Sequence, residues 1–263
     1  MTLGPVEQII DSARHPLGEA AFQEMCKAAL DREGVLVLKD FLRPKALADI
    51  QEEAWDGEAE AYFCVQNHSV YLTPDNPEFD ATHAANRQVV SSKGCICDDQ
   101  IPRESGLRVL YSAGVFRDFV RAVTGEAGLY PYADPLSSIN IHYAKRGQEL
   151  GWHFDNSSFA ITLLIQAPKA GGRFEYVKDL RDAEAGEMNY PGVKTLLDGN
   201  MMPAVLDIDP GSLVFFRGRN SIHRVTPNES DQTRMLAVLA FNAEPGVALS
   251  EHARMTFYGR LGE

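Results

Sequence analysis

The sequence predicts an α+β fold: a double-stranded β-helix, the jelly-roll or cupin-like core, with N-terminal helices packed on one of its sheets. Two observations predict it. Helical patterns dominate before residue 136, and short strands separated by Gly and Pro dominate after it. No linker, repeat or low-complexity stretch divides the 263 residues. We therefore expect one domain, 1–263, with helical support and lid segments in 1–135 and the jelly-roll core in 136–263.

The first half of the chain contains three predicted helices and one predicted strand. Apolar side chains recur every three or four residues in the first helix, and the second has Pro44 in its first turn, where proline is tolerated. The helices are expected over residues 17–31, 44–57 and 114–124, and the strand over 35–38. Residues 62–106 lack clear periodicity, so we expect a long loop-rich segment, of the kind that often forms lids.

The second half contains seven segments rich in β-branched and aromatic residues, the composition of strands. They are residues 137–144, 159–167, 172–177, 202–208, 211–216, 223–226 and 234–242. Gly and Pro separate them. Short strands in such succession are typical of a double-sheet barrel or jelly roll.

The charge balance excludes some classes of partner. The chain has 25 Lys and Arg against 37 Asp and Glu, a formal net charge of −12, and its basic residues are scattered. Such a chain repels nucleic acids and anionic membrane surfaces. We therefore expect no nucleic-acid or membrane partner and a small-molecule substrate instead. A homodimer is compatible with the sequence.

The sequence shows no pattern of a signal peptide, a membrane span or a disulfide scaffold. No basic region precedes an apolar one at the N-terminus, and no apolar run approaches the roughly 18 residues of a membrane span. The four cysteines are too few and too irregular for a disulfide scaffold, and the C-x-C pair lacks zinc-site spacing. We expect a cytoplasmic protein with reduced thiols.

The residues that point to chemistry lie in the strand-rich half. His153 and Asp155 are two positions apart, and in a strand such residues share a face while Phe154 points away. His223 begins another strand-like segment about 70 residues later. Two histidines and one carboxylate are the facial triad of non-haem Fe(II) oxygenases, which leaves coordination positions open for other ligands.

Arg234 follows His223 at the start of an apolar strand. A guanidinium entering a buried strand needs an anion, and its fork suits a carboxylate. Each feature alone has a common alternative, because an H-x-D pair is often at the surface, a buried His is usually a satisfied core residue, and an Arg at a strand end is usually solvated. Their order and spacing together favour a metal site with a carboxylate-binding arginine.

With this pattern, the chain resembles the Fe(II)/2-oxoglutarate-dependent oxygenase superfamily over roughly residues 136–245. The resemblance implies that His153, Asp155 and His223 bind Fe(II). It implies that Arg234 binds the C5 carboxylate of 2-oxoglutarate. It also implies O2 as a cosubstrate, with ascorbate in a supporting role.

Three segments resemble a bacterial subfamily of radical hydroxylases and halogenases that act on free amino acids. They are INIHYAKRGQELGWHFDNSSFAITLLIQAP, GGRFEYV and GSLVFFRGRNSIHRVTP. The halogenases of that subfamily replace the carboxylate ligand with a small residue, which opens a position for chloride. Asp155 is present here, so the resemblance implies hydroxylation.

Tyr143 lies on the strand before the H-x-D motif and is a candidate for a hydrogen bond to the carboxylate of 2-oxoglutarate or to an iron ligand. The alternative is a core aromatic residue. Asn140 and His142 share one face of that strand and Tyr143 lies on the other, so the three cannot all line one pocket without a twist or bulge.

The substrate side is less well determined. A zwitterionic amino acid needs a cation for its carboxylate and an acceptor for its ammonium, because unpaired charges are costly to bury. The resemblance suggests Arg87 for the carboxylate, with a solvated loop residue as the alternative. Asn156, directly after Asp155, and Asn242, at the end of the last strand, are further substrate candidates. The alternative for Asn156 is a hydrogen bond within the turn. The candidate lid residues are Asn67, His68 and Tyr71.

The sequence thus predicts an Fe(II)- and 2-oxoglutarate-dependent dioxygenase that hydroxylates a free amino acid or a similar small polar metabolite, with release of succinate and CO2. Two alternatives stay open. One keeps the same cofactors but ends in desaturation, cyclisation or chlorination. The other is a cupin-like metal- or ligand-binding protein without turnover, which leaves Arg234 unexplained.

Overall fold

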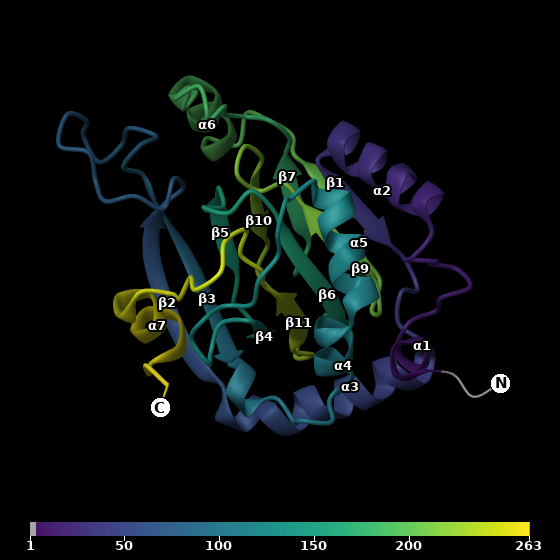
Figure 1. Cartoon of the computed structure of the whole chain (residues 1–263). Helices are drawn as coiled ribbons and strands as arrows, with labels where there is room; N and C mark the ends of the chain where they lie inside the picture. The colour runs from purple at the N-terminus through teal and green to yellow at the C-terminus, as the bar shows by residue number, and fades with distance from the viewer. Residues whose placement is uncertain (1–3, 263) are drawn as a thin grey trace.

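A computed structural model describes residues 4–262 of the chain. Its strands pair antiparallel in the order β1-β9-β6-β11-β4-β3-β5-β10-β7-β8, and β2 pairs with β3. The sheet curls into a half-barrel, with helices on its outside (Figure 1). The predicted α+β jelly-roll fold is confirmed.

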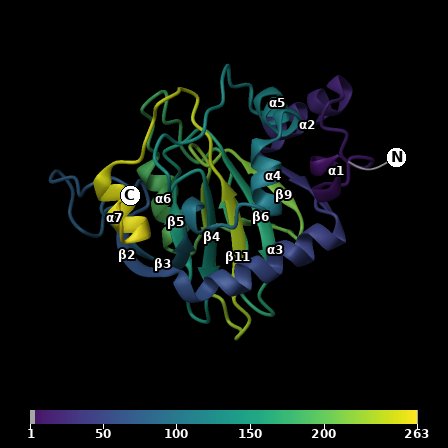
Figure 2. The same ribbon diagram turned by 60° about the horizontal axis from the view of Figure 1, so that its bottom comes forward.

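The larger part of the sheet carries the N-terminal helices. Its strands are β1 (Val35–Leu38), β9 (Leu213–Phe216), β6 (Ala160–Gln166), β11 (Arg234–Leu239) and β4 (Ile139–Ala144). The helices are α2 (Ala20–Glu33), α3 (Pro44–Gly57), α4 (Gly106–Ser112) and α5 (Gly114–Thr124). Figure 2 shows α3 crossing β4, β11 and β6. Helices and strands share one apolar core, as predicted for helices packed on one sheet.

Strand periodicity decides which side chains enter this core. On β11, Met235 and Ala237 are buried against the helices, whereas Arg234 and Leu236 face a cavity on the other side. The same alternation holds on β9, where Phe215 is in the core and Phe216 lines the cavity. The inner face of the sheet is therefore free to hold a ligand.

The smaller part of the sheet closes the cavity from the opposite side. Its strands are β5 (Leu150–His153), β10 (Ile222–Val225), β7 (Phe174–Val177) and β8 (Ala204–Leu206). Helix α6 (Tyr190–Leu197) covers it, with Val193 and Leu196 in a second apolar cluster that includes Trp152 and Phe154. The strand that carries the H-x-D motif is thereby anchored from outside.

The prediction of a loop-rich segment over 62–106 is wrong for two stretches of it. Residues Tyr62–Ser69 and Gln88–Ile96 form a long hairpin, β2 and β3, whereas the stretch between them and most of 97–105 are loop. The hairpin was hidden because its pattern is inverted: Gln66 faces the cavity, while Val65 is 72% exposed. A polar inner face and an apolar outer face do not give the usual strand signal.

The remaining elements are short. They are α1 (Pro5–Ile9), α7 (Glu251–Tyr258), and 3-10 turns at Glu58–Glu60 and Asp98–Gln100. Helix α7 packs against β2 and β3 (Figure 1). The helices predicted at 44–57 and 114–124 and the strand at 35–38 are confirmed with the same bounds. Within residues 4–262, no helix combines the length and apolarity needed to cross a membrane.

Candidate functional site

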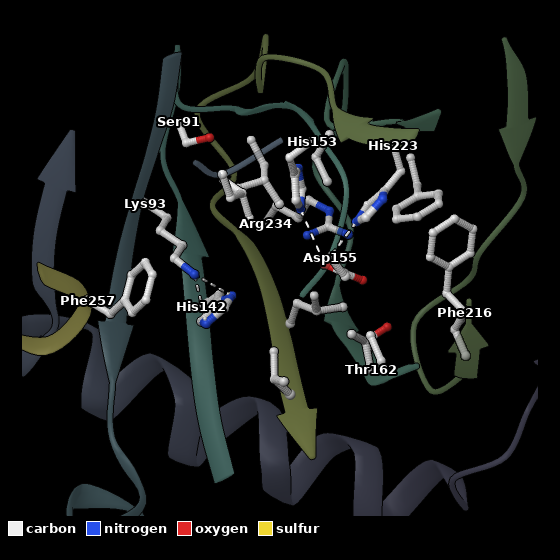
Figure 3. Close-up of a pocket in the computed structure, with 18 of the residues that line it drawn as sticks. Ser91, Lys93, His142, His153, Asp155, Thr162, Phe216, His223, Arg234 and Phe257 are labelled. Atoms are coloured by element: carbon white, nitrogen blue, oxygen red, sulfur yellow. Dashed lines mark hydrogen bonds and ion pairs between the residues drawn. The ribbon is translucent and has the colours of Figure 1, made fainter. Parts of the chain in front are cut away.

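The predicted metal ligands converge between β5 and β10. His153 ends β5 and His223 lies on β10, and the two residues are register partners. Asp155 follows β5 by two positions, and its Oδ1 lies 3.6 Å from Nε2 of His153 and 3.6 Å from Nε2 of His223. The three ligand atoms lie within 4.8 Å of one another (Figure 3). Together they form a His-Asp-His metal-binding triad.

Backbone carbonyls orient both imidazoles. Nδ1 of His153 donates to the carbonyl of Gly151 at 2.8 Å, and Nδ1 of His223 donates to that of Ser221 at 3.1 Å. Because a carbonyl only accepts, the proton is on Nδ1 and the lone pair of Nε2 is available to a metal. Burial, with the neighbouring His223 as a lesser cause, holds the pKa of His153 well below its usual range, so this imidazole is neutral.

The carboxylate of Asp155 has a buried oxygen without a hydrogen-bond partner among the described residues. Its Oδ2 is buried and accepts no hydrogen bond from residues 4–262. A buried unpaired carboxylate oxygen is costly, and a bound cation removes that cost. Two imidazoles and one carboxylate, each with a free donor atom, are the set that suits Fe(II). The residues present therefore fit the metal.

Gly218 provides the space for this carboxylate. A Cβ atom at Gly218 would lie 1.9 Å from Oδ2 of Asp155 and 2.9 Å from Cε1 of His223. The backbone carbonyl of Gly218 also accepts from the N–H of Asp155 at 3.0 Å. The absence of a side chain at Gly218 is thus part of the geometry of the triad, which sequence reasoning did not detect.

Arg234 brings an unpaired cation to the same cavity. Its side chain is buried at the start of β11, and burial lowers its pKa to about 10, so it stays charged. In the described part of the chain, no carboxylate forms an ion pair with it. A buried guanidinium without a partner needs an anion from outside the chain. Its assignment to the C5 carboxylate of 2-oxoglutarate stays a prediction.

The triad and Arg234 line one cavity of about 330 Å³. Its walls are mainly apolar, with Leu236 and Phe216 among them, and a few polar side chains project inward. Such a combination is typical of a small-molecule site. Lys93 and His142 form a further polar pair that lies to one side of the triad in Figure 3.

Lys93 was missed from sequence. It lies on β3, and its Nζ is 3.1 Å from Nε2 and 3.3 Å from Nδ1 of His142 on the neighbouring strand β4. The signal that finds it is the alternation of Ser91 and Lys93 on one strand face, which requires residues 88–96 to be recognised as a strand.

The predicted role of Tyr143 in binding 2-oxoglutarate is wrong. Its side chain is fully buried on the helix-facing side of β4, and its hydroxyl donates to the carbonyl of Ala54 in α3 at 2.7 Å. The alternation along β4 turns His142, rather than Tyr143, into the cavity. Tyr143 is the core aromatic residue of the alternative interpretation.

Arg87 does not reach the cavity either, which corrects its predicted role as the substrate's carboxylate partner. Its Nη1 forms an ion pair with Asp198 at 2.5 Å, and its Nη2 donates to the carbonyl of Leu197 at 2.8 Å. Both partners lie at the end of α6. The guanidinium is therefore already satisfied, and it ties the loop after β2 to that helix.

The two asparagines predicted to contact substrate also lie outside the cavity lining. The carbonyl of Asn156 accepts from Nη1 of Arg219 at 2.9 Å, so this residue belongs to the turn after the H-x-D motif. Asn242 pairs through its backbone with Tyr130, beyond the end of β11. Neither side chain lines the cavity, so the geometry gives no support to a substrate contact by either residue.

The three candidate lid residues lie in three different environments. His68 lines the cavity, and its Nε2 lies 2.7 Å from Oγ of Ser91. Asn67, its neighbour on β2, is exposed on the outer face. Tyr71 stacks on Phe154, with ring centroids 5.4 Å apart, and supports the motif from behind.

A family model described as halogenase D matches residues 18–256. The chain belongs to the halogenase D family. A search of the curated proteins gave no match.

Solved structures similar to this halogenase D family member come from 2-oxoglutarate oxygenases. The carbocyclase SnoK from nogalamycin biosynthesis has a TM-score of 0.57 and 15% identity, covering 91% of this chain and 93% of that one. The epimerase SnoN of the same biosynthesis has a TM-score of 0.57 and 14% identity, covering 84% and 80%. A 2OG-Fe(II) oxygenase family protein from Burkholderia pseudomallei has a TM-score of 0.53 and 13% identity, covering 86% and 92%.

At these identities the likeness establishes the fold. The predicted resemblance to the Fe(II)/2-oxoglutarate oxygenase superfamily is thereby confirmed. The narrower resemblance to hydroxylases of free amino acids stays a prediction.

Proposed function

We propose that the protein is an Fe(II)- and 2-oxoglutarate-dependent dioxygenase that hydroxylates an unactivated C–H bond of a free amino acid or a similar small polar metabolite, with release of succinate and CO2. The observation that carries the proposal is the complete His153–Asp155–His223 triad in one cavity with the unpaired cation of Arg234. A metal-binding protein without turnover has no use for that buried guanidinium.

The residues of the chain have separate tasks in this proposal. The triad holds Fe(II), and Arg234 binds the far carboxylate of 2-oxoglutarate, which orients the cosubstrate. Bound iron and 2-oxoglutarate together supply the oxidising power that activates O2 and breaks the C–H bond. The apolar walls keep water from the reacting groups, and no protein acid or nucleophile is required.

The size of the cavity supports a small substrate. Its volume of about 330 Å³ lies at the lower end of the range for small-molecule sites. Cosubstrate and substrate must share this space, because the triad and Arg234 line the same cavity. A free metabolite fits such a site better than a protein side chain on a folded partner.

Chlorination is the second candidate, and the family name favours it. Against it stands Asp155, whose Oδ1 lies beside both imidazoles and fills the place that a chloride would take. Products formed with and without chloride separate the two outcomes, because both start by removing a hydrogen atom. Desaturation and cyclisation are separated by the same mass analysis.

The test is a screen of free amino acids and their derivatives with Fe(II), ascorbate and 2-oxoglutarate, reading succinate formation. We expect at least one compound to stimulate succinate release and to gain one oxygen atom by mass spectrometry. Reactions without iron, and with the Asp155→Ala variant, are the controls. Unrelated small metabolites are screened in parallel. Stimulation by one of these alone would contradict the amino-acid part, and absence of stimulated succinate release with both kinds of compound would contradict the oxygenase proposal.

A further inference from the structure

The cavity holds a second cation, Lys93, which is partly buried and lies on β3, the strand that pairs with β5 of the triad. Lys93 on β3 projects into it beside His142 on β4, and Phe257 of α7 lies over the ammonium with its ring centroid 5.8 Å from Nζ (Figure 3). Burial lowers the pKa of Lys93 and holds that of His142 well below its usual range. His142 is therefore a neutral acceptor for one of the three N–H groups of the ammonium.

The other N–H groups of Lys93 face a cavity that offers them no counter-charge. Among the cavity-lining residues of the described chain, Asp155 is the one acidic side chain, and the triad engages it. No Asp or Glu within residues 4–262 forms an ion pair with Lys93. A charged ammonium held in this way is costly unless an anion joins it.

This position is distinct from that of Arg234. Strand β4 lies between β3, which carries Lys93, and β11, which carries Arg234. The backbones of the two cationic residues are thus two strand spacings apart, roughly 10 Å. Figure 3 shows the guanidinium of Arg234 toward the triad and the ammonium of Lys93 beside His142, so the cavity offers separate places to two anionic groups.

We propose that Lys93, positioned by His142, binds the carboxylate of the substrate, and that the enzyme therefore accepts organic acids and amino acids whose side chain carries no positive charge. The inference rests on the proposed function, in which the cosubstrate's carboxylate is already placed at Arg234. A cationic side chain would meet two cations in the cavity and no free carboxylate, which selects against it.

L-Norleucine is a suitable probe, because three relatives each change one group. Hexanoate lacks its ammonium, pentylamine lacks its carboxylate, and L-lysine adds a positive charge at the end of the same carbon chain. Each is titrated calorimetrically into the Fe(II)- and 2-oxoglutarate-loaded enzyme without oxygen. We expect L-norleucine and hexanoate to bind, and pentylamine and L-lysine to bind at least roughly 10-fold more weakly.

The Lys93→Met variant should weaken binding of L-norleucine by roughly 10- to 100-fold, the effect of losing one hydrogen-bonded charge, and leave the affinity for 2-oxoglutarate unchanged. Lys93→Arg should retain most of the affinity. Lys45→Met, which removes a lysine with an 85% exposed side chain, is the matched control and should bind like the wild type.

Three results would overturn the proposal: unchanged L-norleucine binding in Lys93→Met, loss of 2-oxoglutarate rather than L-norleucine affinity in that variant, or failure of both carboxylate probes to bind the wild type. Loss of 2-oxoglutarate affinity in Lys93→Met would assign Lys93 to binding of the cosubstrate instead. Succinate release is measured separately, so a failure of the proposed oxidation is told apart from a failure of this carboxylate site.

Discussion

Where β5 and β10 line the cavity, backbone carbonyls fix the two histidines of the triad, and Gly218 leaves room for the carboxylate of Asp155. Where β3 and β4 line it, the polar groups are Lys93 and His142, and they contact each other across neighbouring strands. On the side of β5 and β10, the two imidazoles and the carboxylate direct electron-pair donors to one position. The side of β3 and β4 presents an N–H donor to the open cavity.

This difference separates the residues that bind the metal from the residue proposed to select the substrate. Donor atoms that converge and lack partners of their own are suited to a cation, and a partly buried ammonium without a carboxylate is suited to an anion. In the strand order, β3 and β4 lie between β11, which carries Arg234, and the strands of the triad, β5 and β10. Substitutions on the metal side should abolish or weaken turnover for any substrate, whereas Lys93 should affect only which substrate binds.

The largest effect is expected for Asp155→Ala. Loss of a residue that merely orients a ligand costs roughly 10- to 100-fold in metal affinity, and loss of the ligand itself should cost more. We expect no measurable succinate release and no stabilisation of the protein by Fe(II) in thermal unfolding. Asp118→Ala, an exposed aspartate on α5, is the control. Turnover at the wild-type rate would remove Asp155 from the triad.

Arg234→Ala should act on the cosubstrate. Truncating one partner of a buried, hydrogen-bonded charge pair costs about 2–5 kcal/mol, so the KM for 2-oxoglutarate should rise by at least roughly 30-fold. Fe(II) binding should be retained, because Arg234 is not a ligand. Arg146→Ala, which removes an exposed ion pair with Asp231, should leave the KM unaltered. An unchanged KM in the Arg234 variant would contradict its assigned role.

Gly218→Ala tests whether Fe(II) binding requires the space that Gly218 leaves beside Asp155. The new methyl group would overlap Oδ2 of Asp155, so the carboxylate must turn away from the two histidines. We expect Fe(II) affinity to fall by roughly 10- to 100-fold while the fold is kept. The control is Gly114→Ala, where a Cβ atom meets nothing within 4 Å. Fe(II) affinity equal to the wild type would show that the site relaxes without cost.

The smallest effect is expected for Tyr143→Phe, which touches neither side of the cavity. Loss of its hydrogen bond to Ala54 should lower the free energy of unfolding by about 1 kcal/mol and the Tm by about 2–4 °C. The KM for 2-oxoglutarate should not change. Tyr111→Phe, which loses a similar bond to the carbonyl of Ala240, is a matched comparison. A raised KM in the Tyr143 variant alone would restore its role in cosubstrate binding.

The sequence by itself determined the fold class and the triad. A period of two along the strands predicts which residues share a face, and the order H-x-D, His, Arg is a local pattern that survives without knowledge of packing. The helices at 44–57 and 114–124 were likewise predicted from local periodicity and from the residues that begin and end a helix. These predictions hold because each depends on residues close together in the chain.

The tertiary structure decided which face of each strand borders the cavity and which side chains arrive there from distant segments. Periodicity separated His142 from Tyr143, but only the packing of α3 against β4 turned Tyr143 into the core. Arg87 is held away by Asp198, more than a hundred residues distant in sequence. Lys93 reaches His142 because β3 pairs with β4. Contacts of this kind depend on strand register and on the competition between partners, which no local pattern encodes.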